Sequence, residues 1–567
     1  MVASTCLSHI DNGRLEYEPS LYAALEEPFR KNWKKAAVQT MHQSSSHLAN
    51  IVGSSAGQST NGVSGNLTWT YQQLHQGAVR LTAALKNAAI KEGSTISPIL
   101  PNGVDWCLSF FTSILAKMNM ASLDLGLLQD ARKVQLEGFL EELQPAVIIV
   151  ADNAGAAAVD AAIKATGVVV PVKLVSPSDK SAAVPQGWSE LDSYGPKIDA
   201  SAEAAILESA RSDNHDRTAL TLFTSGSSVG RPKGCPRNVL TLLHGLGAAP
   251  KADKTTPSRR LIHSANFRAV LPLVSLATWG DGDTMIIAGP SAAPAGAIDA
   301  VAQLQVTDMI LFPAQLHAIA THPSLDVSRN GSVATVAMGG DILTRTTVQL
   351  AQAIFPNAKF VNVFGMSEGG NFFHWPFFKG DIVYYADVPS FGTVRNIVPR
   401  GTPGEMHVDT YITIRNYLHN VSPQNFYTQD GVNWMKTGDT AIIDEKGHCF
   451  ILGRSKDIIK RAAIPITPAV LETTLAAYTS AVVAVIGIDH PVLGAEPYAI
   501  LSSFQDKTEN DLKSEVVEVL GKDYAIGGAV TLKQLGYDDW PVNPNIGKVN
   551  KIELKAALLR YLASKSS

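Results

Sequence analysis

A glycine-rich loop limits what this chain can fold into more than any other stretch. The segment Thr224-Ser-Gly-Ser-Ser-Val-Gly-Arg-Pro-Lys-Gly234 combines glycines, hydroxyl side chains and one lysine. Glycines let the backbone approach an anion closely, while the hydroxyls and Lys233 supply hydrogen-bond donors. The apolar run 219–223 before the loop predicts a buried strand, and residues 238–246 after it predict a helix. We therefore expect a strand, a loop and a helix in the order that brings backbone N–H groups to a phosphate.

The composition of this loop does not decide its function alone. Clusters of Ser, Gly and Pro are also typical of plain surface loops. The P-loop of ordinary nucleoside triphosphatases ends in Gly-Lys followed by Ser or Thr, whereas Lys233 follows Pro232 and precedes Gly234. The sequence therefore favours a nucleotide loop of another kind, and other motifs must support it.

The chain around this loop predicts an α/β protein. Apolar residues at helical spacing alternate with short apolar runs, and the continuous run 145–150 is typical of a strand buried on both faces of a parallel sheet. The alternation returns after the loop, so we expect two α/β subdomains. The other predicted helices are 71–88, 106–118, 297–303 and 346–354, and the other predicted strands are 95–100, 284–288, 309–312 and 359–364.

The composition and the predicted elements at the two ends of the chain differ from those of its middle. Residues 1–66 are interpreted as a variable entry region, with an exposed Ser/Gly/Asn-rich loop at 44–66 and no assigned chemistry. Short strands with Gly and Pro turns, such as 404–408, 440–444 and 448–452, begin near Phe391 and predict a small β-barrel-like unit. A smaller α+β region follows Gly453 and ends in the predicted helix 551–563. We expect an N-terminal domain at 1–453 and a mobile C-terminal domain at 454–567.

Composition excludes several classes of protein. The 567 residues, 45% hydrophobic and 17% charged, can form large cores in at least two domains. A net charge of −4 gives the chain no overall excess of positive charge with which to bind nucleic acid. The four cysteines form no CxxC pair, which argues against a zinc site or a disulfide framework. No apolar run reaches the ~18 residues of a membrane span, and no signal peptide is evident, so we expect a cytoplasmic protein.

Four further motifs follow the loop in order. They are Asn362-Val-Phe-Gly-Met-Ser-Glu368, Trp434-Met-Lys-Thr-Gly-Asp439, Gly453-Arg-Ser-Lys-Asp457 and Asn543-Pro-Asn-Ile-Gly-Lys548. Each motif is weak alone, but the ordered set resembles the adenylate-forming superfamily of acyl-CoA synthetases, nonribosomal peptide adenylation domains and luciferases. The resemblance spans residues 67–559 and is strongest to stand-alone acyl- or aryl-CoA ligases. It implies ATP-dependent activation of a carboxylic acid to an acyl-adenylate, release of pyrophosphate, and acyl transfer to CoA.

The resemblance also implies a nucleotide site. Phe364 stands where the superfamily usually has tyrosine, and its ring can stack on adenine. Asp439 can accept hydrogen bonds from the ribose hydroxyls, and Arg454 can contact ribose or phosphate. A core aromatic and two surface charges are the ordinary alternatives. The implied nucleotide-binding residues are Thr224, Ser225, Gly226, Ser227, Gly230, Lys233, Gly340, Asp341, Phe364, Gly365, Ser367, Asp439 and Arg454.

Three residues carry the chemistry in this interpretation. Glu368 would hold Mg²⁺ on the triphosphate, although alone it is an acid in a loop. Lys233 would hold phosphate, and Lys548, otherwise an ordinary surface lysine, would neutralise charge developing between the substrate carboxylate and the α-phosphate. Lys456 matches the hinge about which the small domain turns between half-reactions.

The substrate is less defined. The resemblance places Asn266, Phe267, Arg268, Gly339 and Gly369 at the acid-binding pocket. The aspartate that amino-acid-activating domains use is missing, so an α-amino acid is disfavoured. The aromatic segment 372–378 can line an apolar or aryl pocket, but such runs are also typical of core, and Arg268 and His374 can each meet a polar substituent.

Departures from the pattern leave alternatives open. The phosphate loop is one residue longer than usual at Ser228-Val229. Ala463 replaces a glycine that lines the pantetheine tunnel of CoA ligases, and Val470 replaces a glutamate. An amine or a separate carrier-protein thiol is therefore the alternative acceptor. An inactive nucleotide-binding regulatory protein is a third alternative, against which Glu368, Asp439 and Lys548 argue.

Overall fold

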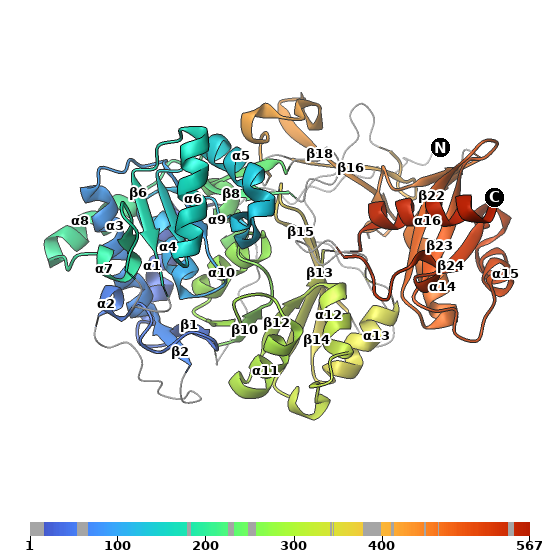
Figure 1. Ribbon diagram of the computed structural model, residues 1–567, viewed down its shortest axis with the longest axis horizontal. Coiled ribbons are helices and arrows are strands. Elements are labelled where there is room, and N and C mark those ends of the chain that lie inside the picture. The colour runs from blue at the N-terminus through green and yellow to red at the C-terminus, as the bar shows by residue number, and fades with distance from the viewer. Residues whose placement is uncertain are drawn as a thin grey trace, which may run out of the picture.

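Two large sheets form most of the molecule, and two smaller sheets follow them along the chain (Figure 1). The computed structural model describes residues 16–53, 66–177, 183–224, 232–247, 257–340, 343, 345–377, 398–409, 413–446, 449–462, 464–542 and 549–566. Both large sheets are mainly parallel and carry antiparallel strands only at their edges. The predicted α/β class with two α/β subdomains is therefore confirmed.

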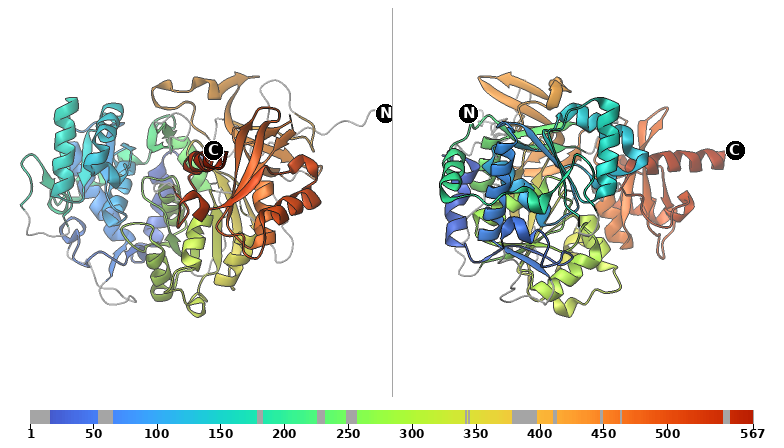
Figure 2. Two further views of the ribbon diagram at one scale, coloured as in Figure 1. Left: turned by 45° about the vertical axis from the view of Figure 1, so that its right-hand side comes forward. Right: turned by 60° about the vertical axis from the view of Figure 1, so that its left-hand side comes forward.

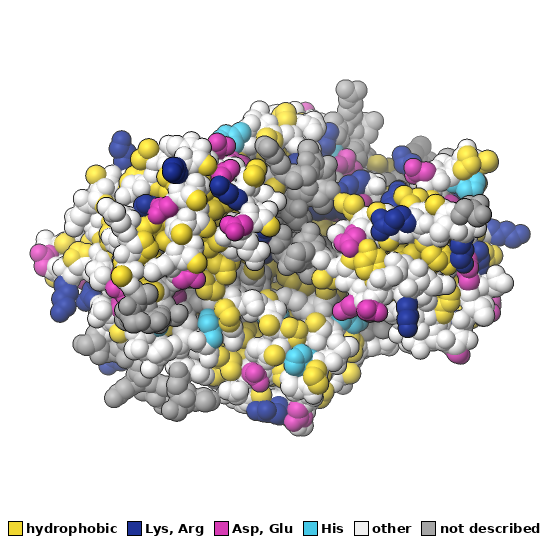
Figure 3. Space-filling view, in the orientation of Figure 1, with side chains coloured by type: hydrophobic (Ala, Val, Ile, Leu, Met, Phe, Trp, Pro, Cys, Tyr) yellow, Lys and Arg dark blue, Asp and Glu magenta, His cyan; other side chains and the backbone are white. Residues whose placement is uncertain are grey.

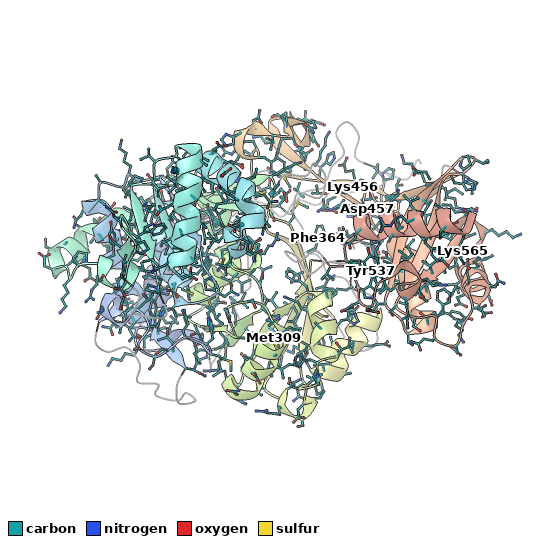
Figure 4. All side chains as sticks on the ribbon, in the orientation of Figure 1. Met309, Phe364, Lys456, Asp457, Tyr537 and Lys565 are labelled. Carbon is teal, nitrogen blue, oxygen red and sulfur yellow. The ribbon has the colours of Figure 1, made fainter. Side chains whose placement is uncertain are left out.

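The eight-stranded sheet has the strand order β15-β14-β13-β12-β10-β11-β1-β2. Its core lies between β10–β14 and the helices α11–α13, and it includes Met309, Val336 and Phe360. Met309 is labelled in Figure 4. The strands are β1 (Ala36–Thr40), β2 (Leu67–Thr70), β10 (Arg259–Ile262), β11 (Thr284–Ile287), β12 (Asp308–Leu311), β13 (Thr335–Gly339), β14 (Lys359–Gly365) and β15 (Asn371–Phe377). The helices of this part are α10 (Val270–Gly280), α11 (Pro294–Leu304), α12 (Pro313–Ala320) and α13 (Arg345–Ile354).

The seven-stranded sheet has the order β7-β6-β5-β3-β4-β8-β9. Every residue of β5 is buried, as its unbroken apolar run predicts. The strands are β3 (Thr95–Ile99), β4 (Asn119–Met120), β5 (Val147–Val150), β6 (Val172–Val175), β7 (Ser189–Glu190), β8 (Thr218–Phe223) and β9 (Gly234–Asn238). The helices are α1 (Leu21–Lys31), α2 (Ala49–Val52), α3 (Tyr71–Asn87), α4 (Val104–Leu115), α5 (Lys133–Leu143), α6 (Asn153–Thr166), α7 (Leu191–Tyr194), α8 (Ala200–Ala210) and α9 (Val239–Gly247).

The entry region is more than a variable lead-in, which corrects that interpretation. Strand β1 lies inside the eight-stranded sheet, parallel to β11 and antiparallel to β2. Its polar residues Gln39 and Thr40 are buried, and Gln39 accepts a hydrogen bond from Arg259 at 2.7 Å. The strand was missed because this short run, Ala-Ala-Val-Gln-Thr, has neither a long apolar stretch nor a strict alternation.

Two smaller units complete the chain. The first is a four-stranded antiparallel sheet of β16 (Gly404–Asp409), β17 (Phe426–Gln429), β18 (Val432–Ile443) and β19 (Cys449–Arg454). The second is a five-stranded sheet of β20 (Ile459–Arg461), β21 (Ile464–Ile466), β22 (Val483–His490), β23 (Gly494–Leu501) and β24 (Gly528–Thr531), with helices α14 (Pro468–Thr479), α15 (Glu509–Leu520) and α16 (Lys551–Ser566). This C-terminal unit lies at one end of the body (Figure 2) and has two apolar clusters of its own.

Charged side chains of both signs are mixed over the face shown in Figure 3. This mixture on one face agrees with the small net charge of the chain, −4. Among the described helices, none is both long and apolar enough to cross a membrane.

Candidate active site

The candidate site lies where the carboxyl ends of strands from both large sheets meet. In open α/β sheets, ligands bind at the carboxyl ends of parallel strands. The loops after β10, β13 and β14 carry several of the predicted site residues, among them Arg268, Gly340 and Glu368. Asn102, which follows β3 of the seven-stranded sheet, donates a hydrogen bond to the carbonyl of Ser264, which follows β10. The two sheets are thus joined at these ends.

The Gly339–Gly340 turn at the end of β13 requires glycine at both positions. A Cβ on Gly339 would overlap the carbonyl oxygen of Val363 on the adjacent strand β14. Gly340 has a φ of +76°, and a Cβ there would lie 2.6 Å from the ring of Phe312. The glycine pair is therefore more than a simple turn, because it lets the backbone pack closely against both neighbours.

Glu368 is held on a tight turn after β14. The backbone N–H of Gly369 donates to the carbonyl of Met366 at 3.2 Å. The hydroxyl of Tyr417 donates to Oε1 of Glu368 at 2.8 Å, and burial raises the pKa of Tyr417 so that it stays protonated. The N–H of Ile414 donates to the Glu368 carbonyl at 2.7 Å. Residues 414–417 therefore orient the carboxylate, a contribution that sequence reasoning missed.

Arg237 on β9 supports the same turn and was also missed. Its side chain is 1% exposed, and it donates from Nε to the carbonyl of Ser367 at 3.0 Å and from Nη2 to that of Met366 at 2.9 Å. Burial lowers its pKa to about 10, while the nearby charge of Glu368 opposes that shift. Arg237 thus ties the seven-stranded sheet to the turn that carries Glu368. The sequence held no local signal for this role, because the two carbonyls that Arg237 contacts lie 130 and 129 positions away in the chain.

The glycine loop connects two strands, which corrects the predicted strand–loop–helix order. Strand β9 pairs antiparallel with β8, and α9 begins only after it. Thr224 and Lys233 close the loop: Thr224 N–H donates to the Lys233 carbonyl at 3.0 Å, and Lys233 N–H donates to the Thr224 hydroxyl at 3.1 Å. The strand was not predicted because proline is rare inside strands. Pro236 is tolerated here because β9 is at the edge of its sheet.

Tyr417 joins the glycine loop to the acidic turn. The Nζ of Lys233 lies 4.9 Å from the centroid of the Tyr417 ring, whose hydroxyl binds Glu368. A cation at this distance from an aromatic ring is held by its quadrupole. The lysine at the base of the loop and the predicted metal ligand are therefore brought to one place.

Two other predicted nucleotide residues are paired across the hairpin β18–β19. Asp439 lies opposite Arg454, whose Nε is 3.1 Å from Asp439 Oδ1 and whose Nη1 donates to the Thr437 carbonyl. Asp439 is 5% exposed, whereas about half of the Arg454 side chain is exposed. Asp439 lies inside the long strand β18, so its backbone position is fixed.

Phe364 and Lys456 lie on different elements. Phe364, on β14 opposite Phe373 of β15, packs against the main core and is near the centre of the molecule in Figure 4. Gly365 follows it at a register shift between the two strands. Lys456 is exposed in the turn after β19, and Figure 4 shows it with Asp457 where the four-stranded sheet leads into the C-terminal unit.

The loop after β10 carries Asn266, Phe267 and Arg268. Asn266 is buried and donates from Nδ2 to the carbonyl of Leu100 at 2.7 Å. The guanidinium of Arg268 stacks over the ring of Phe267 at 4.9 Å from its centroid. Several predicted site positions lie outside the described residues: Ser225, Gly226, Ser227, Gly230, Asp341 and Lys548, together with Ala463 and the side chain of His374.

Comparisons with known proteins identify the family. The model of the family described as "AMP-binding enzyme" matches residues 54–418. An acyl-CoA ligase of Pestalotiopsis microspora is 31% identical over 98% of this chain and 99% of that protein. The ATP-bound structure of MatB from Rhodopseudomonas palustris superposes with a TM-score of 0.73 at 21% identity, covering 95% of this chain and 98% of that one. Amide bond synthetase McbA from Marinactinospora thermotolerans superposes with a TM-score of 0.72 at 19% identity, covering 95% and 99%. The predicted recognition is confirmed: the chain belongs to the AMP-binding enzyme family.

Proposed function

We propose that this chain uses ATP to activate a carboxylic acid as an acyl-adenylate and then transfers the acyl group to CoA. The family match and the full-length similarity to an acyl-CoA ligase support this acid–thiol ligase reaction. The observation that carries the proposal within the structure is the contact of Tyr417 with both Lys233 and Glu368. It brings Lys233, which we propose to hold phosphate, close to Glu368 where the two sheets meet.

In this reaction the protein contributes mainly by positioning the substrates and by neutralising charge, and it forms no covalent bond with them. An oxygen of the substrate carboxylate attacks the α-phosphorus in line, and pyrophosphate leaves. Lys233 and the loop 224–234 would hold the phosphates, and Lys548 would neutralise the charge that develops at the reacting centre. Asp439 and Arg454 would bind the ribose, while Phe364 and the Gly339–Gly340 turn would border adenine.

Magnesium fits Glu368 as one ligand of an ion shared with the triphosphate. Within the described residues, no group of three or more His, Cys, Asp or Glu side chains is placed to hold a metal. Mg²⁺ is commonly held by one or two carboxylates together with substrate phosphates and water, so a single oriented carboxylate suffices. When bound, the ion would neutralise phosphate charge, while Tyr417 keeps Glu368 oriented.

A hinge at Lys456 would let the C-terminal unit change position between the two half-reactions. The turn at 455–457 separates β19, which belongs to the four-stranded sheet, from β20 of the five-stranded sheet. This arrangement supports a domain boundary at that turn, just after the predicted division between 453 and 454, because Arg454 still belongs to β19. Hinges are short segments of this kind, at the ends of elements.

Pyrophosphate release tests the function. We expect the protein to release pyrophosphate from ATP only when a suitable carboxylic acid is present, and to form a thioester when CoA is added. Aryl, short-chain and long-chain acids should be screened with and without CoA. No release with any acid would contradict acid activation. Release without thioester formation would instead favour an amine or a carrier-protein thiol as acceptor, since the fold is shared with an amide bond synthetase.

Replacing Glu368 with glutamine should raise the Mg²⁺ concentration needed for half-maximal activity and lower turnover about 10- to 100-fold, because a neutral amide holds a hard cation poorly. The measurement is pyrophosphate release as a function of Mg²⁺ concentration. Glu445→Gln, an exposed glutamate near the turn before β19, is the matched control and should behave as the wild type. Superimposable Mg²⁺ titrations of Glu368→Gln and the wild type would remove Glu368 as the ligand.

A further inference from the structure

The loop after β10 holds buried polar atoms that nothing in the described part of the chain satisfies. These atoms are Nε2 of His263, Oδ1 of Asn266 and Nε of Arg268. His263 and Asn266 are only 3% and 2% exposed. Most buried polar atoms in proteins have hydrogen-bond partners, so three such atoms within six residues call for a physical explanation.

Loose placement does not explain them, because the loop is held firmly from both sides. The N–H of Asn266 donates to Oδ1 of Asn102 at 3.0 Å, and Asn102 donates to the carbonyl of Ser264 at 2.9 Å. Gln315 on α12 donates to the carbonyl of His263 at 2.7 Å. The loop is therefore preorganised by these three hydrogen bonds to its backbone, while Nε2 of His263, Oδ1 of Asn266 and Nε of Arg268 remain without hydrogen-bond partners in the described part of the chain.

The loop is also connected to the predicted nucleotide and acid site. Gln315, which holds His263, accepts a hydrogen bond from the N–H of Phe312 at 2.9 Å. Phe312 in turn packs against the Gly340 turn so closely that a Cβ on Gly340 would lie 2.6 Å from its ring. The unsatisfied atoms thus belong to the loop next to the predicted site at the same end of the sheet.

The charge of Arg268 decides what this loop can bind. The charged groups that act on its pKa are Asp124, which raises it, and Arg132, which lowers it, and these two side chains pair with each other at 2.5 Å. Asp124 also accepts a hydrogen bond from the N–H of Gly126 at 3.0 Å. The three side chains together therefore carry an excess positive charge. Burial lowers the pKa of Arg268 to about 10, which leaves the guanidinium charged at neutral pH.

Within the described residues Arg268 has no ion-pair partner, and a charged guanidinium that is partly withdrawn from water without one is costly unless a ligand supplies it. A carboxylate matches the guanidinium geometry, because two parallel N–H···O bonds can form. We propose that Arg268 binds a second carboxylate of the acid, so that the substrate class of this enzyme is a dicarboxylic acid. The inference rests on the proposed acid-activating function. One carboxylate would be activated and the other held by Arg268.

The test compares length-matched acids in the adenylation half-reaction, without CoA. Pyrophosphate release is measured with succinate against butyrate, adipate against hexanoate, and terephthalate against 4-methylbenzoate. We expect the wild type to favour the diacid of at least one pair by tenfold or more in kcat/KM. Arg268→Met should lower kcat/KM for that diacid about 10- to 100-fold and leave the monoacid value nearly unchanged, because a charge-assisted hydrogen bond is lost.

Two further variants test whether the effect depends on the guanidinium of Arg268. Arg268→Lys keeps the charge without the planar fork, so it should retain part of the diacid preference. Arg329→Met removes an exposed arginine from the same α/β subdomain and should leave the preference intact. Melting temperatures of all variants report whether they fold.

The outcomes separate the inference from the function on which it rests. Wild-type activity that favours the diacid of no pair, whether it is equal for both acids or favours the monoacid, would overturn the inference alone. An Arg268→Met variant that loses monoacid and diacid activity equally, with a raised KM for ATP, would also overturn it, because Arg268 would then serve a phosphate. An absence of pyrophosphate release with every acid would overturn the proposed function, and the inference with it.

Discussion

The Lys548→Ala variant is expected to lose adenylate formation by about 10²- to 10³-fold while it keeps the fold and ATP binding. The physical reason is that a preorganised charge at the reacting centre stabilises the transition state more than the bound substrates. Lys548 lies next to Val549, which forms a β-bridge with Val542, so the two ends of the segment 543–548 are joined. A substitution within that segment removes no buried contact that the structure describes.

The measurement is pyrophosphate release with an accepted acid, together with ATP binding and melting temperature. Lys533→Ala, an exposed lysine of the same C-terminal unit, is the matched control and should retain activity. Preformed acyl-AMP should still react with CoA in Lys548→Ala, because the second half-reaction does not need this charge. Wild-type rates of pyrophosphate release in Lys548→Ala would contradict the role of the lysine.

Sequence patterns predicted the elements with strong periodicity and missed those without it. The predicted helix 71–88 is α3, Tyr71–Asn87, which begins with a capping box between Thr70 and Gln73. The predicted strand 145–150 contains β5, whose four residues are all apolar and buried. Strands β1 and β9 were missed because Gln39, Thr40 and Pro236 interrupt their apolar character. Strand β1 is stabilised by pairing with β11, far along the chain, and β9 by pairing with β8 across the glycine loop, and the local composition of neither strand shows this pairing.

The same distinction applies to the site. Glu368, the Gly339–Gly340 pair and Asp439 were predicted because they belong to local motifs with recognisable spacing. Tyr417 and Arg237 contribute through contacts with Glu368, Ser367 and Met366, which lie 49 to 130 positions away in the chain. Such contacts depend on how the two sheets meet. Without the fold, Tyr417 is one of many aromatic residues and Arg237 one of many charges.

Arg237 offers the clearest test of how the two sheets position the acidic turn. Arg237→Leu keeps an apolar side chain in the buried position but removes both donors to the carbonyls of Met366 and Ser367. The carbonyl of Met366 keeps the N–H of Gly369 as a donor, whereas that of Ser367 loses the donor that Arg237 supplies, at a cost of about 1–3 kcal/mol. This cost is offset in part because a buried charge is removed as well. We expect a melting temperature lower by roughly 5 °C.

The effect on catalysis should be larger than the effect on stability. When the turn loosens, Glu368 no longer has a fixed position relative to Lys233 and the triphosphate. Misplacement of a catalytic group by about 1 Å can cost roughly 100-fold in rate, so we expect turnover to fall about 10- to 100-fold and the required Mg²⁺ concentration to rise. Pyrophosphate release at a temperature where the variant remains folded, titrated with Mg²⁺, measures both quantities.

Arg259→Leu is the matched control for this prediction. Arg259 is also a partly buried arginine that donates to a main-chain carbonyl, that of Leu304 at 2.5 Å, and burial lowers its pKa as well. It lies on β10 and, within the described residues, makes no hydrogen bond or ion pair with the Glu368 turn, so its loss should reduce stability without changing the Mg²⁺ dependence. If Arg237→Leu and Arg259→Leu lowered the melting temperature alike and both kept wild-type Mg²⁺ titrations, Arg237 would be a structural residue only. A raised Mg²⁺ requirement in Arg237→Leu alone would show that the edge of one sheet positions the acid carried by the other.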